Sequence, residues 1–238
     1  MKNSGNKIIP NFHERTLCPS CNSKELEIKF KHTINEKSLD YLKNIYNYNG
    51  SRKNLDIFNK SKIVICQCKN CHSKFHKLIP CDLTLKYIYT PLINKDISLK
   101  KNKFHEPFIY KKSINLLKKL KSLLKINRDT KIYHLDFGCG WGTILKASRD
   151  LNLNPIGIEP TKYQQKNMER ENIKVYSSIQ TLIKKGIPKN FNIITSNQVL
   201  EHVKNPNLIL SELRKISSEG SILYLSVPAF IDKEVLSF

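Results

Sequence analysis

One short segment, Asp136 to Gly142 with the sequence DFGCGWG, constrains the fold of this chain more than any other. It directly follows strand-forming residues, Lys131 to Phe137, and directly precedes a helical pattern. Glycines at alternate positions let the backbone turn sharply and come close to a ligand. A dinucleotide fingerprint would have a glycine where Thr143 stands, and a P-loop would continue with Gly-Lys-Ser/Thr. The segment therefore predicts a strand, a ligand-binding turn of neither type, and a helix.

Strands and helices alternate along the rest of the chain. The pattern predicts strands at 131–137, 155–158, 173–176, 191–196 and 222–227, and helices at 143–152, 161–171, 179–185 and 205–218. Asn205 is the expected N-cap of the last helix, with Pro206 at its first position, and Gly220 is expected to end it. This alternation predicts an α/β fold with a Rossmann-like, mostly parallel sheet and helices on both faces. Ligands of such sheets bind at the carboxyl ends of the strands.

A helical pattern also precedes the first of these strands. It begins at Glu106, with Pro107 near its first turn, and lysines fill one face. The apolar stripe on the opposite face consists of Ile109, Ile114, Leu117, Leu120, Leu123 and Leu124. We expect this helix to pack beside the sheet; a basic amphipathic helix on a membrane surface is the alternative. Residues 81–103 are interpreted as a connector, and residues 31–62 show no clear core pattern. The predicted division is an N-terminal module with connector, 1–103, and an α/β domain, 104–238.

Glu159 ends the second predicted strand, downstream of the glycine segment. A carboxylate at this place in a Rossmann-like sheet can accept hydrogen bonds from both hydroxyls of a ribose. Together with a glycine loop that is neither a dinucleotide fingerprint nor a P-loop, it suits a nucleoside ligand without a pyrophosphate.

These segments resemble the class I S-adenosylmethionine-dependent methyltransferases of the small-molecule and sugar type. DFGCGWG is similar to the first motif of that family, and Gly157 to Pro160 (GIEP) to its second acidic position. Ser196 to Val203 (SNQVLEHV) is similar to the SNxxLEHV segment at the end of the fourth strand, and Ile222 to Pro228 to the fifth-strand segment. The resemblance spans about residues 130–230 and implies methyl transfer from S-adenosylmethionine.

The resemblance also implies roles for single residues. Asp136 and the backbone of the glycine segment would hold the methionyl end of the cofactor, Glu159 would bind its ribose, and the segment around Ser178 would lie beside adenine. Asn197, Gln198 and Val199 would form the wall between cofactor and acceptor. The implied cofactor-binding residues are Asp136, Gly138, Cys139, Gly140, Trp141, Gly142, Glu159, Ser178, Asn197 and Gln198. Within this set, packing alone explains Trp141 equally well, and Cys139 is interpreted as a small filler of a tight turn.

Transfer to a hydroxyl requires alignment of the acceptor and removal of a proton. His202, just beyond the fourth strand, is the candidate general base because histidine titrates near neutral pH. The alternative is that Glu201 and His202 organise the loop and the start of the next helix through hydrogen bonds to the backbone. His134, inside the first strand, is interpreted as a packed core histidine.

Two features depart from the family pattern. Relatives usually begin the fourth strand with Phe-Asp, whereas this chain has Phe191 and Asn192. Relatives also continue after the fifth strand with a helix and an antiparallel hairpin that cover the sheet edge, whereas this sequence ends shortly after Pro228. Because a bare edge is a liability, we expect either a fragment or truncated product, or a partner chain that covers the edge.

The chain has seven cysteines, at positions 18, 21, 66, 68, 71, 81 and 139. The pairs Cys18/Cys21 and Cys68/Cys71 are both C-x₂-C, a spacing from which four thiolates can close a tetrahedral site for structural Zn²⁺ with no open position. The gap between the pairs is longer than in the usual zinc ribbon, but the entropic cost of a loop grows slowly with its length. The competing ligands are Cys66, His72 and His76. Packed cysteines without a metal and a redox C-x-x-C are the alternatives.

Charge and termini limit the partners and the compartment. Lys and Arg number 41 against 20 Asp and Glu, a net charge of +21 that is concentrated before Lys125. Such a basic half favours RNA or another polyanion, although a solvated lysine surface and an AT-rich genome also produce many lysines. The odd cysteine count and the N-terminus without an apolar region argue against a secreted disulfide protein, and no apolar run reaches the ~18 residues of a membrane span. We expect a cytoplasmic protein.

A zinc module before such a domain also resembles bacterial sugar and surface-polysaccharide methyltransferases, which commonly have glycine where His72 stands. The first prediction is therefore a small-molecule acceptor, a sugar or nucleotide-sugar hydroxyl. RNA ranks second, by analogy with rRNA methyltransferases that have an N-terminal zinc finger, because no basic patch interleaved with aromatic residues is evident. A non-catalytic, cofactor-binding partner subunit is the third alternative.

Overall fold

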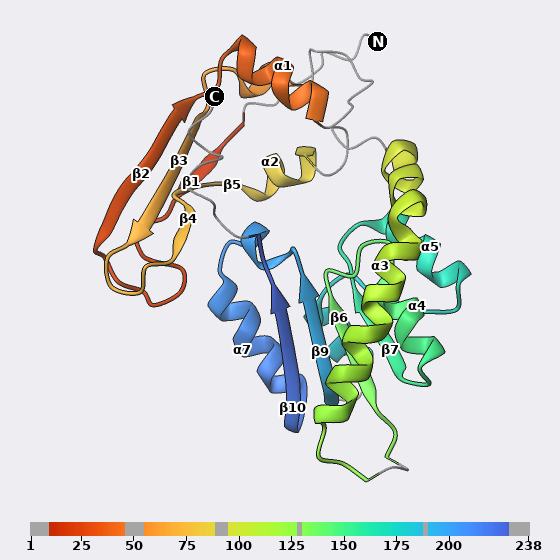
Figure 1. The fold of residues 1–238 in the computed structure, drawn as a ribbon. Helices are drawn as coiled ribbons and strands as arrows, with labels where there is room; N and C mark the ends of the chain where they lie inside the picture. The colour runs from red at the N-terminus through yellow and green to blue at the C-terminus, as the bar shows by residue number, and fades with distance from the viewer. Residues whose placement is uncertain (1–9, 46–54, 89–94, 128–129, 188–189, 229–238) are drawn as a thin grey trace. The chain divides into compact units, whose positions relative to one another are not determined.

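The structure is a computed structural model, and it describes residues 10–45, 55–88, 95–127, 130–187 and 190–228. The chain divides into two compact units, 1–98 and 99–238 (Figure 1). The predicted boundary after residue 103 falls inside one helix, α3 (Lys95–Leu123), which begins shortly before the second unit.

The first unit consists of two small antiparallel sheets and short helices. One sheet has the strand order β2-β3-β4, and in the other β1 pairs with β5. The strands are β1 (Phe12–Glu14), β2 (Leu26–Thr33), β3 (Lys62–Cys68), β4 (Lys74–His76) and β5 (Leu78–Pro80). The helices are α1 (Glu36–Ile45), the 3₁₀ turn η2 (Asp56–Phe58) and α2 (Asp82–Tyr87).

Residues 31–62 contain a small apolar core that the sequence pattern did not reveal. Its buried members are Ile34, Leu39, Leu55 and Phe58. These side chains are too few, and too widely separated by Asn and Lys, to produce a recognisable period in the sequence. Residues 46–54 of this segment lie outside the described residues. The segment is therefore part of the folded module and not a polar insert.

The second unit is built on a five-stranded parallel sheet with the order β10-β9-β6-β7-β8. The strands are β6 (Tyr133–Phe137), β7 (Asn154–Ile158), β8 (Lys174–Tyr176), β9 (Phe191–Asn197) and β10 (Ser217–Ser226). The helices that follow the first four strands are α4 (Thr143–Asp150), α5 (Lys162–Arg170), α6 (Ile179–Lys184) and α7 (Pro206–Ile216). This arrangement confirms the predicted Rossmann-like α/β fold. The strand order reverses between β6 and β9, which makes their carboxyl ends the favoured place for a ligand.

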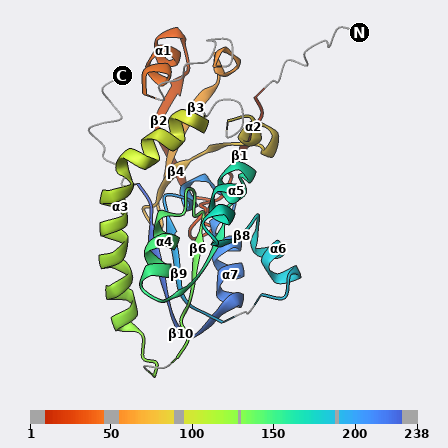
Figure 2. The same cartoon turned by 90° about the vertical axis from the view of Figure 1, so that its right-hand side faces the viewer.

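Two apolar layers cover the faces of this sheet. Leu135 of β6 packs with Leu182 of α6 and Leu213 of α7 on one face. Leu117 of α3 and Ala147 of α4 pack on the other. Figure 2 shows the sheet between these two pairs of helices. Successive side chains of a strand point to opposite faces. His134 and Asp136, which alternate with the apolar residues of β6, therefore face α3 and α4.

The last helix begins as predicted and ends differently. The Asn205 side chain accepts a hydrogen bond from the Leu208 N–H at 3.1 Å, which confirms it as the N-cap. The prediction that Gly220 ends this helix is wrong, because α7 ends at Ile216 and the chain enters β10 at once. Gly220 has φ +68° and lies in a register shift between Ser217 and Ile222. A glycine in the left-handed region is typical of such an irregular strand.

Helix α3 starts earlier than predicted, but most of the predicted apolar stripe faces the core. It begins at Lys95 and continues through Pro107, so residues 81–103 are not a simple connector. Figure 2 shows α3 changing direction part-way along its length, as expected for a helix with an internal proline, which removes one hydrogen bond. Four residues of the predicted stripe pack into the core: Ile114, Leu117, Leu120 and Leu124. The other two, Ile109 and Leu123, are exposed, at 37% and 59%. The buried face also includes Ser113, whose hydroxyl donates to the Ile109 carbonyl at 2.8 Å.

Polar contacts also attach α3 to the body of the second unit. The Tyr110 hydroxyl donates to Asp150 at 2.7 Å, and Lys146 of α4 lies 3.0 Å from Glu106. The apolar face of α3 is thus covered by the sheet and α4.

Within the described part of the chain, no helix is both long and apolar enough to cross a membrane.

Replacement of Leu117 by alanine tests which face of α3 is buried. Leu117 is fully buried, so its truncation should lower the free energy of unfolding by about 2–5 kcal/mol. The matched variant Leu123→Ala, on the exposed face, should change it by about 0.5 kcal/mol or less. Urea denaturation measures both values. Equal losses for the two variants would contradict this account of the helix.

Candidate functional site

The glycine loop between β6 and α4 is held by backbone hydrogen bonds. The N–H groups of Gly138 and Cys139 both donate to the Ile158 carbonyl, at 2.8 and 3.0 Å. The Gly142 N–H donates to the Cys139 carbonyl at 2.8 Å, which closes the turn. These bonds fix the loop against the carboxyl end of β7.

Two of the three glycines are required by packing as well as by backbone conformation. Gly138 and Gly142 have φ of +78° and +77°. A Cβ at Gly138 would lie 2.3 Å from a methyl group of Val199, and a Cβ at Gly142 would lie 1.7 Å from the sulfur of Met168. Gly140 also has positive φ, but its nearest neighbour would be Gln164 at 3.8 Å. The loop is therefore packed at both ends and open at its centre.

Glu159 meets this loop at its open centre. One oxygen of its carboxylate accepts a hydrogen bond from the Gly140 N–H at 3.1 Å, and the other accepts one from the Thr161 N–H at 2.8 Å. The side chain is buried. Each carboxylate oxygen can accept a second hydrogen bond, so Glu159 retains capacity for a ligand beside the loop.

Asp136 and His134 form a buried polar group beneath the loop. Asp136 accepts a hydrogen bond from the Thr195 hydroxyl at 2.6 Å. Burial raises the pKa of Asp136 to about 7; the bond from Thr195 opposes this shift, and the charge of Glu159 adds to it. Burial lowers the pKa of His134 to about 3, so its imidazole is neutral. His134 is fully buried and contacts Ser148 and Thr195, which agrees with its interpretation as a core histidine.

Cys139 and Trp141 occupy the two remaining positions of the loop. Cys139 is buried, and a Cβ on Gly157 would lie 2.6 Å from its sulfur, so it fills the space beside that glycine. Burial, with the nearby charges of Asp136 and Glu159, raises the pKa of the Cys139 thiol, which disfavours a nucleophilic thiolate. The Trp141 ring is half-buried and lies edge-on to Tyr163, with ring centroids 5.7 Å apart.

Three other predicted cofactor residues lie at or just beyond the carboxyl ends of neighbouring strands. Ser178 follows β8 and caps α6, accepting a hydrogen bond from the Thr181 N–H at 3.1 Å. Asn197 and Gln198, at the end of β9, are exposed. Gln198 has φ +57°, and its N–H donates to Ser226 of β10 at 2.8 Å. Only the next residue, Val199, reaches the glycine loop, at Gly138.

His202 ends a short 3₁₀ turn, η4 (Leu200–His202). Its side chain is 55% exposed, and its Nε2 lies 3.7 Å from a carboxylate oxygen of Glu201. The other oxygen of Glu201 and the hydroxyl of Ser196 are buried and have no hydrogen-bond partner among the described residues. The sequence did not single out Ser196 or the contact of Thr195 with Asp136, because neither follows from local spacing.

Two hollows of about 350 and 420 Å³ lie away from this loop. The smaller one is beside Lys174 and Tyr176 of β8. The larger one is at the amino ends of β6 and β7, beside Tyr133 and Asn154. Neither of these hollows is lined by residues of the glycine loop.

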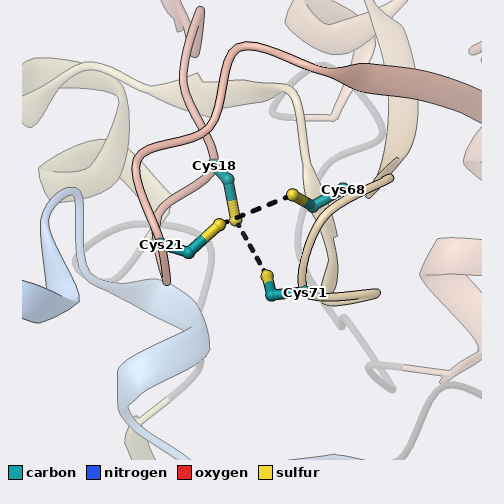
Figure 3. Close-up of side chains that lie close together, drawn as sticks. All are labelled: Cys18, Cys21, Cys68 and Cys71. Atoms are coloured by element: carbon teal, nitrogen blue, oxygen red, sulfur yellow. Dashed lines mark hydrogen bonds between the residues drawn. The ribbon is translucent and has the colours of Figure 1, made fainter.

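The four cysteines of the two C-x₂-C pairs form one cluster (Figure 3), and their ligand atoms all lie within 4.8 Å of one another. The sulfurs of Cys18 and Cys71 are 3.5 Å apart, and those of Cys21 and Cys68 are 3.6 Å apart. Tetrahedral zinc with Zn–S bonds of about 2.3 Å requires sulfurs about 3.8 Å apart. The thiol set therefore fits zinc. The competing residues Cys66, His72 and His76 are not in this cluster.

The two pairs adopt the same local conformation. In the first, the N–H of Cys18 donates to Ser23 at 2.9 Å, and the N–H of Asn22 donates back to Cys18 at 3.0 Å. In the second, Cys68, His72 and Ser73 repeat both bonds at the same distances. Asn22 and His72 have φ of +60° and +59°. His72 thus occupies a left-handed turn position, which is why glycine suits this place in similar chains.

Alanine at two of the loop glycines separates backbone strain from packing. Gly142→Ala combines a left-handed backbone with overlap at Met168 and should cost about 2–5 kcal/mol of unfolding free energy. Gly140→Ala has only the backbone term and should cost about 1–2 kcal/mol. Urea denaturation of the two variants makes the comparison. A larger loss for Gly140→Ala would show that the loop is packed differently.

Comparison with known proteins agrees with this geometry. Residues 110–235, more than half of the chain, match the family described as "Methyltransferase domain". No curated protein matches the chain. Among solved structures, the plantazolicin methyltransferase BpumL in complex with SAH is 23% identical, with a TM-score of 0.45 over 55% of this chain and 51% of that one. An S-adenosylmethionine-dependent methyltransferase from Clostridium acetobutylicum is 15% identical, with a TM-score of 0.43 over 54% and 56%.

The chain spans only 51–60% of the first plantazolicin methyltransferase structures that it matches. The family match, however, covers the complete parallel sheet described above, from within α3 to the end of β10. The chain belongs to the methyltransferase domain family.

Proposed function

We propose that this chain transfers a methyl group from S-adenosylmethionine to a small-molecule acceptor. The observation that carries the proposal is the contact between the Gly140 N–H and the Glu159 carboxylate at 3.1 Å. It brings a flexible glycine loop and a buried acid together at the carboxyl ends of adjacent strands, beside the point where the strand order reverses. Membership of the methyltransferase domain family agrees with this assignment.

The polar groups of the site suit a nucleoside that carries a positive charge. Glu159 retains lone pairs that can accept ribose hydroxyls, and the open side of Gly140 allows a ligand to approach the backbone. Asp136 supplies a buried negative charge under the loop, which favours a positively charged ligand group. When bound, the cofactor supplies a methyl group already activated by its sulfonium. The remaining proposed contacts are with the loop backbone from Gly138 to Gly142 and with Ser178, Asn197 and Gln198.

His202 is the proposed general base for a hydroxyl acceptor. Its exposed imidazole follows the carboxyl end of β9 and is open to a ligand from solvent. A carboxylate oxygen of Glu201 lies 3.7 Å from the Nε2 atom of this imidazole. The alternative, in which Glu201 and His202 only organise the turn, is supported by the bond from the His202 N–H to the Val199 carbonyl at 2.9 Å.

A sugar or nucleotide-sugar hydroxyl is the first proposed acceptor, and RNA is the second. One observation favours RNA. The outer face of α3 carries two exposed phenylalanines, Phe104 and Phe108, among lysines, and Lys112 lies 4.3 Å from the centre of the Phe108 ring. Lysines bind phosphates and exposed aromatic rings stack on bases, so this face combines both contacts of single-stranded nucleic acid binding. The third proposed role for the chain is that of a non-catalytic subunit that binds the cofactor.

A partner chain or further segment at the free edge of the sheet also remains a proposal. Within the described residues, β10 pairs with β9 alone. Leu223, Leu225 and Val227 of this region are exposed, at 38–51%. An edge strand with apolar side chains favours pairing with, or coverage by, another segment.

Titration with S-adenosylmethionine tests the cofactor assignment. Glu159→Gln keeps the size of the side chain but removes its charge and one strong acceptor, so affinity should fall by about ten- to a hundredfold. Glu169→Gln, an exposed position on α5, is the matched control and should leave affinity unchanged. Isothermal titration calorimetry measures both. Unchanged affinity in Glu159→Gln would remove Glu159 from the ribose site.

We also propose that the cysteine cluster holds one structural zinc ion. Metal analysis of the purified chain should find about one zinc per chain, and Cys71→Ser should lose it because the remaining three thiolates leave the tetrahedron incomplete. Cys81→Ser, outside the cluster, is the control and should retain the metal. Chelation should lower the melting temperature of the wild type and of Cys81→Ser, but not that of Cys71→Ser. A stable, metal-free wild type would contradict the proposal.

We also propose a cytoplasmic location. The cysteines of the cluster form no disulfide bonds, which agrees with a reducing compartment.

A further inference from the structure

A line of buried polar side chains crosses the interior of the second unit beneath the glycine loop. It runs from Ser148 of α4 through His134 of β6 and Thr195 of β9 to Asp136 of β6. All four residues are at most 2% exposed. The three successive contacts are 2.8, 2.9 and 2.6 Å. Burying polar groups is costly, and apolar side chains would fill the same space at less cost. This row of hydrogen-bonded side chains therefore suggests a role beyond packing.

The direction of each hydrogen bond follows from the charge of Asp136. An ionised carboxylate can only accept, so the Thr195 hydroxyl donates its single proton to Asp136. The oxygen of Thr195 must then accept from His134, which places the imidazole proton on Nε2. The Nδ1 atom of His134 has no proton and accepts from the Ser148 hydroxyl. All three donors are thus oriented toward Asp136, and hydrogen bonds arranged in this way strengthen one another.

We propose that His134 is a positioning residue: acting through Thr195, it keeps the Asp136 carboxylate ionised and fixed in orientation beneath the glycine loop, where the cationic end of the cofactor binds. The inference rests on the proposed function for the identity of the ligand. The hydrogen-bond chain itself involves only residues of this unit. His134 is suited to the role because it is neutral, so it polarises Thr195 without adding a second buried charge.

The other titratable groups around Asp136 do not stabilise its charge. Glu159, at the end of β7, is itself an acid, and its charge raises the pKa of Asp136. Cys139, in the loop, has a thiol whose pKa is raised by burial. The lysine of α4, Lys146, forms ion pairs with Glu106 and Glu171. The bond from Thr195 opposes the rise in the pKa of Asp136, which makes the donor chain the main local support of the carboxylate.

Two variants of His134 separate positioning from packing. His134→Gln retains an N–H donor near the place of Nε2, whereas His134→Leu removes both ring nitrogens. Thr195→Val breaks the same chain at another residue if His134→Leu does not fold. In ¹³C NMR spectra of the ligand-free chain, the pH midpoint of the Asp136 carboxyl group should rise by about one unit in His134→Leu and Thr195→Val, because lost donors destabilise the carboxylate. His134→Gln should stay close to the wild type.

The same variants are then titrated with S-adenosylhomocysteine at pH 7. Affinity should fall about tenfold in His134→Leu and Thr195→Val and less than threefold in His134→Gln. ¹⁵N NMR should find the His134 proton on Nε2. A proton on Nδ1, or an Asp136 midpoint that is the same in all variants, would overturn the inference. A wild type with the expected tautomer and midpoints that binds no S-adenosylhomocysteine would instead refute the proposed function, and with it the ligand named here.

Discussion

The carboxyl ends of β6 and β7 are joined by a small set of hydrogen bonds, and the proposed site depends on them. The Ile158 carbonyl accepts from two successive N–H groups of the glycine loop, and the Glu159 carboxylate accepts from a third, that of Gly140. Only residues that tolerate positive φ can follow this path, and Val199 and Met168 fill the space where side chains would be. The turn is therefore held on both sides and remains open at its centre.

The chemistry proposed for the site follows from this geometry. The glycines of the loop allow a nucleoside to approach the backbone, and the two acids beside the loop differ in environment. Glu159 accepts two backbone N–H bonds, whereas Asp136 is buried and receives its bond from Thr195. The first suits neutral hydroxyl groups, and the second suits a positive charge. In our proposal, the hydrogen-bond chain from His134 opposes the effect of burial on Asp136 and favours its ionised form.

Local rules predicted much of the second unit. The alternation of strands and helices, the glycine turn and the Asn205 cap depend on neighbouring residues, and all are found in the structure. The errors arose where distant contacts decide. Pro107 does not begin α3, which starts at Lys95 and continues through the proline, and Gly220 belongs to an irregular strand. The contact of Thr195 with Asp136 joins residues far apart in the sequence, so no motif could reveal it. The cysteine cluster was predictable because its spacing is repeated.

The most direct test of the central claim is an experimental structure of this chain with S-adenosylhomocysteine. The account predicts that the adenosyl group lies over residues 138–142, with its ribose hydroxyls within hydrogen-bond distance of the Glu159 carboxylate. A ligand bound elsewhere, or ribose hydroxyls beyond hydrogen-bond distance of Glu159 at saturating ligand, would contradict it.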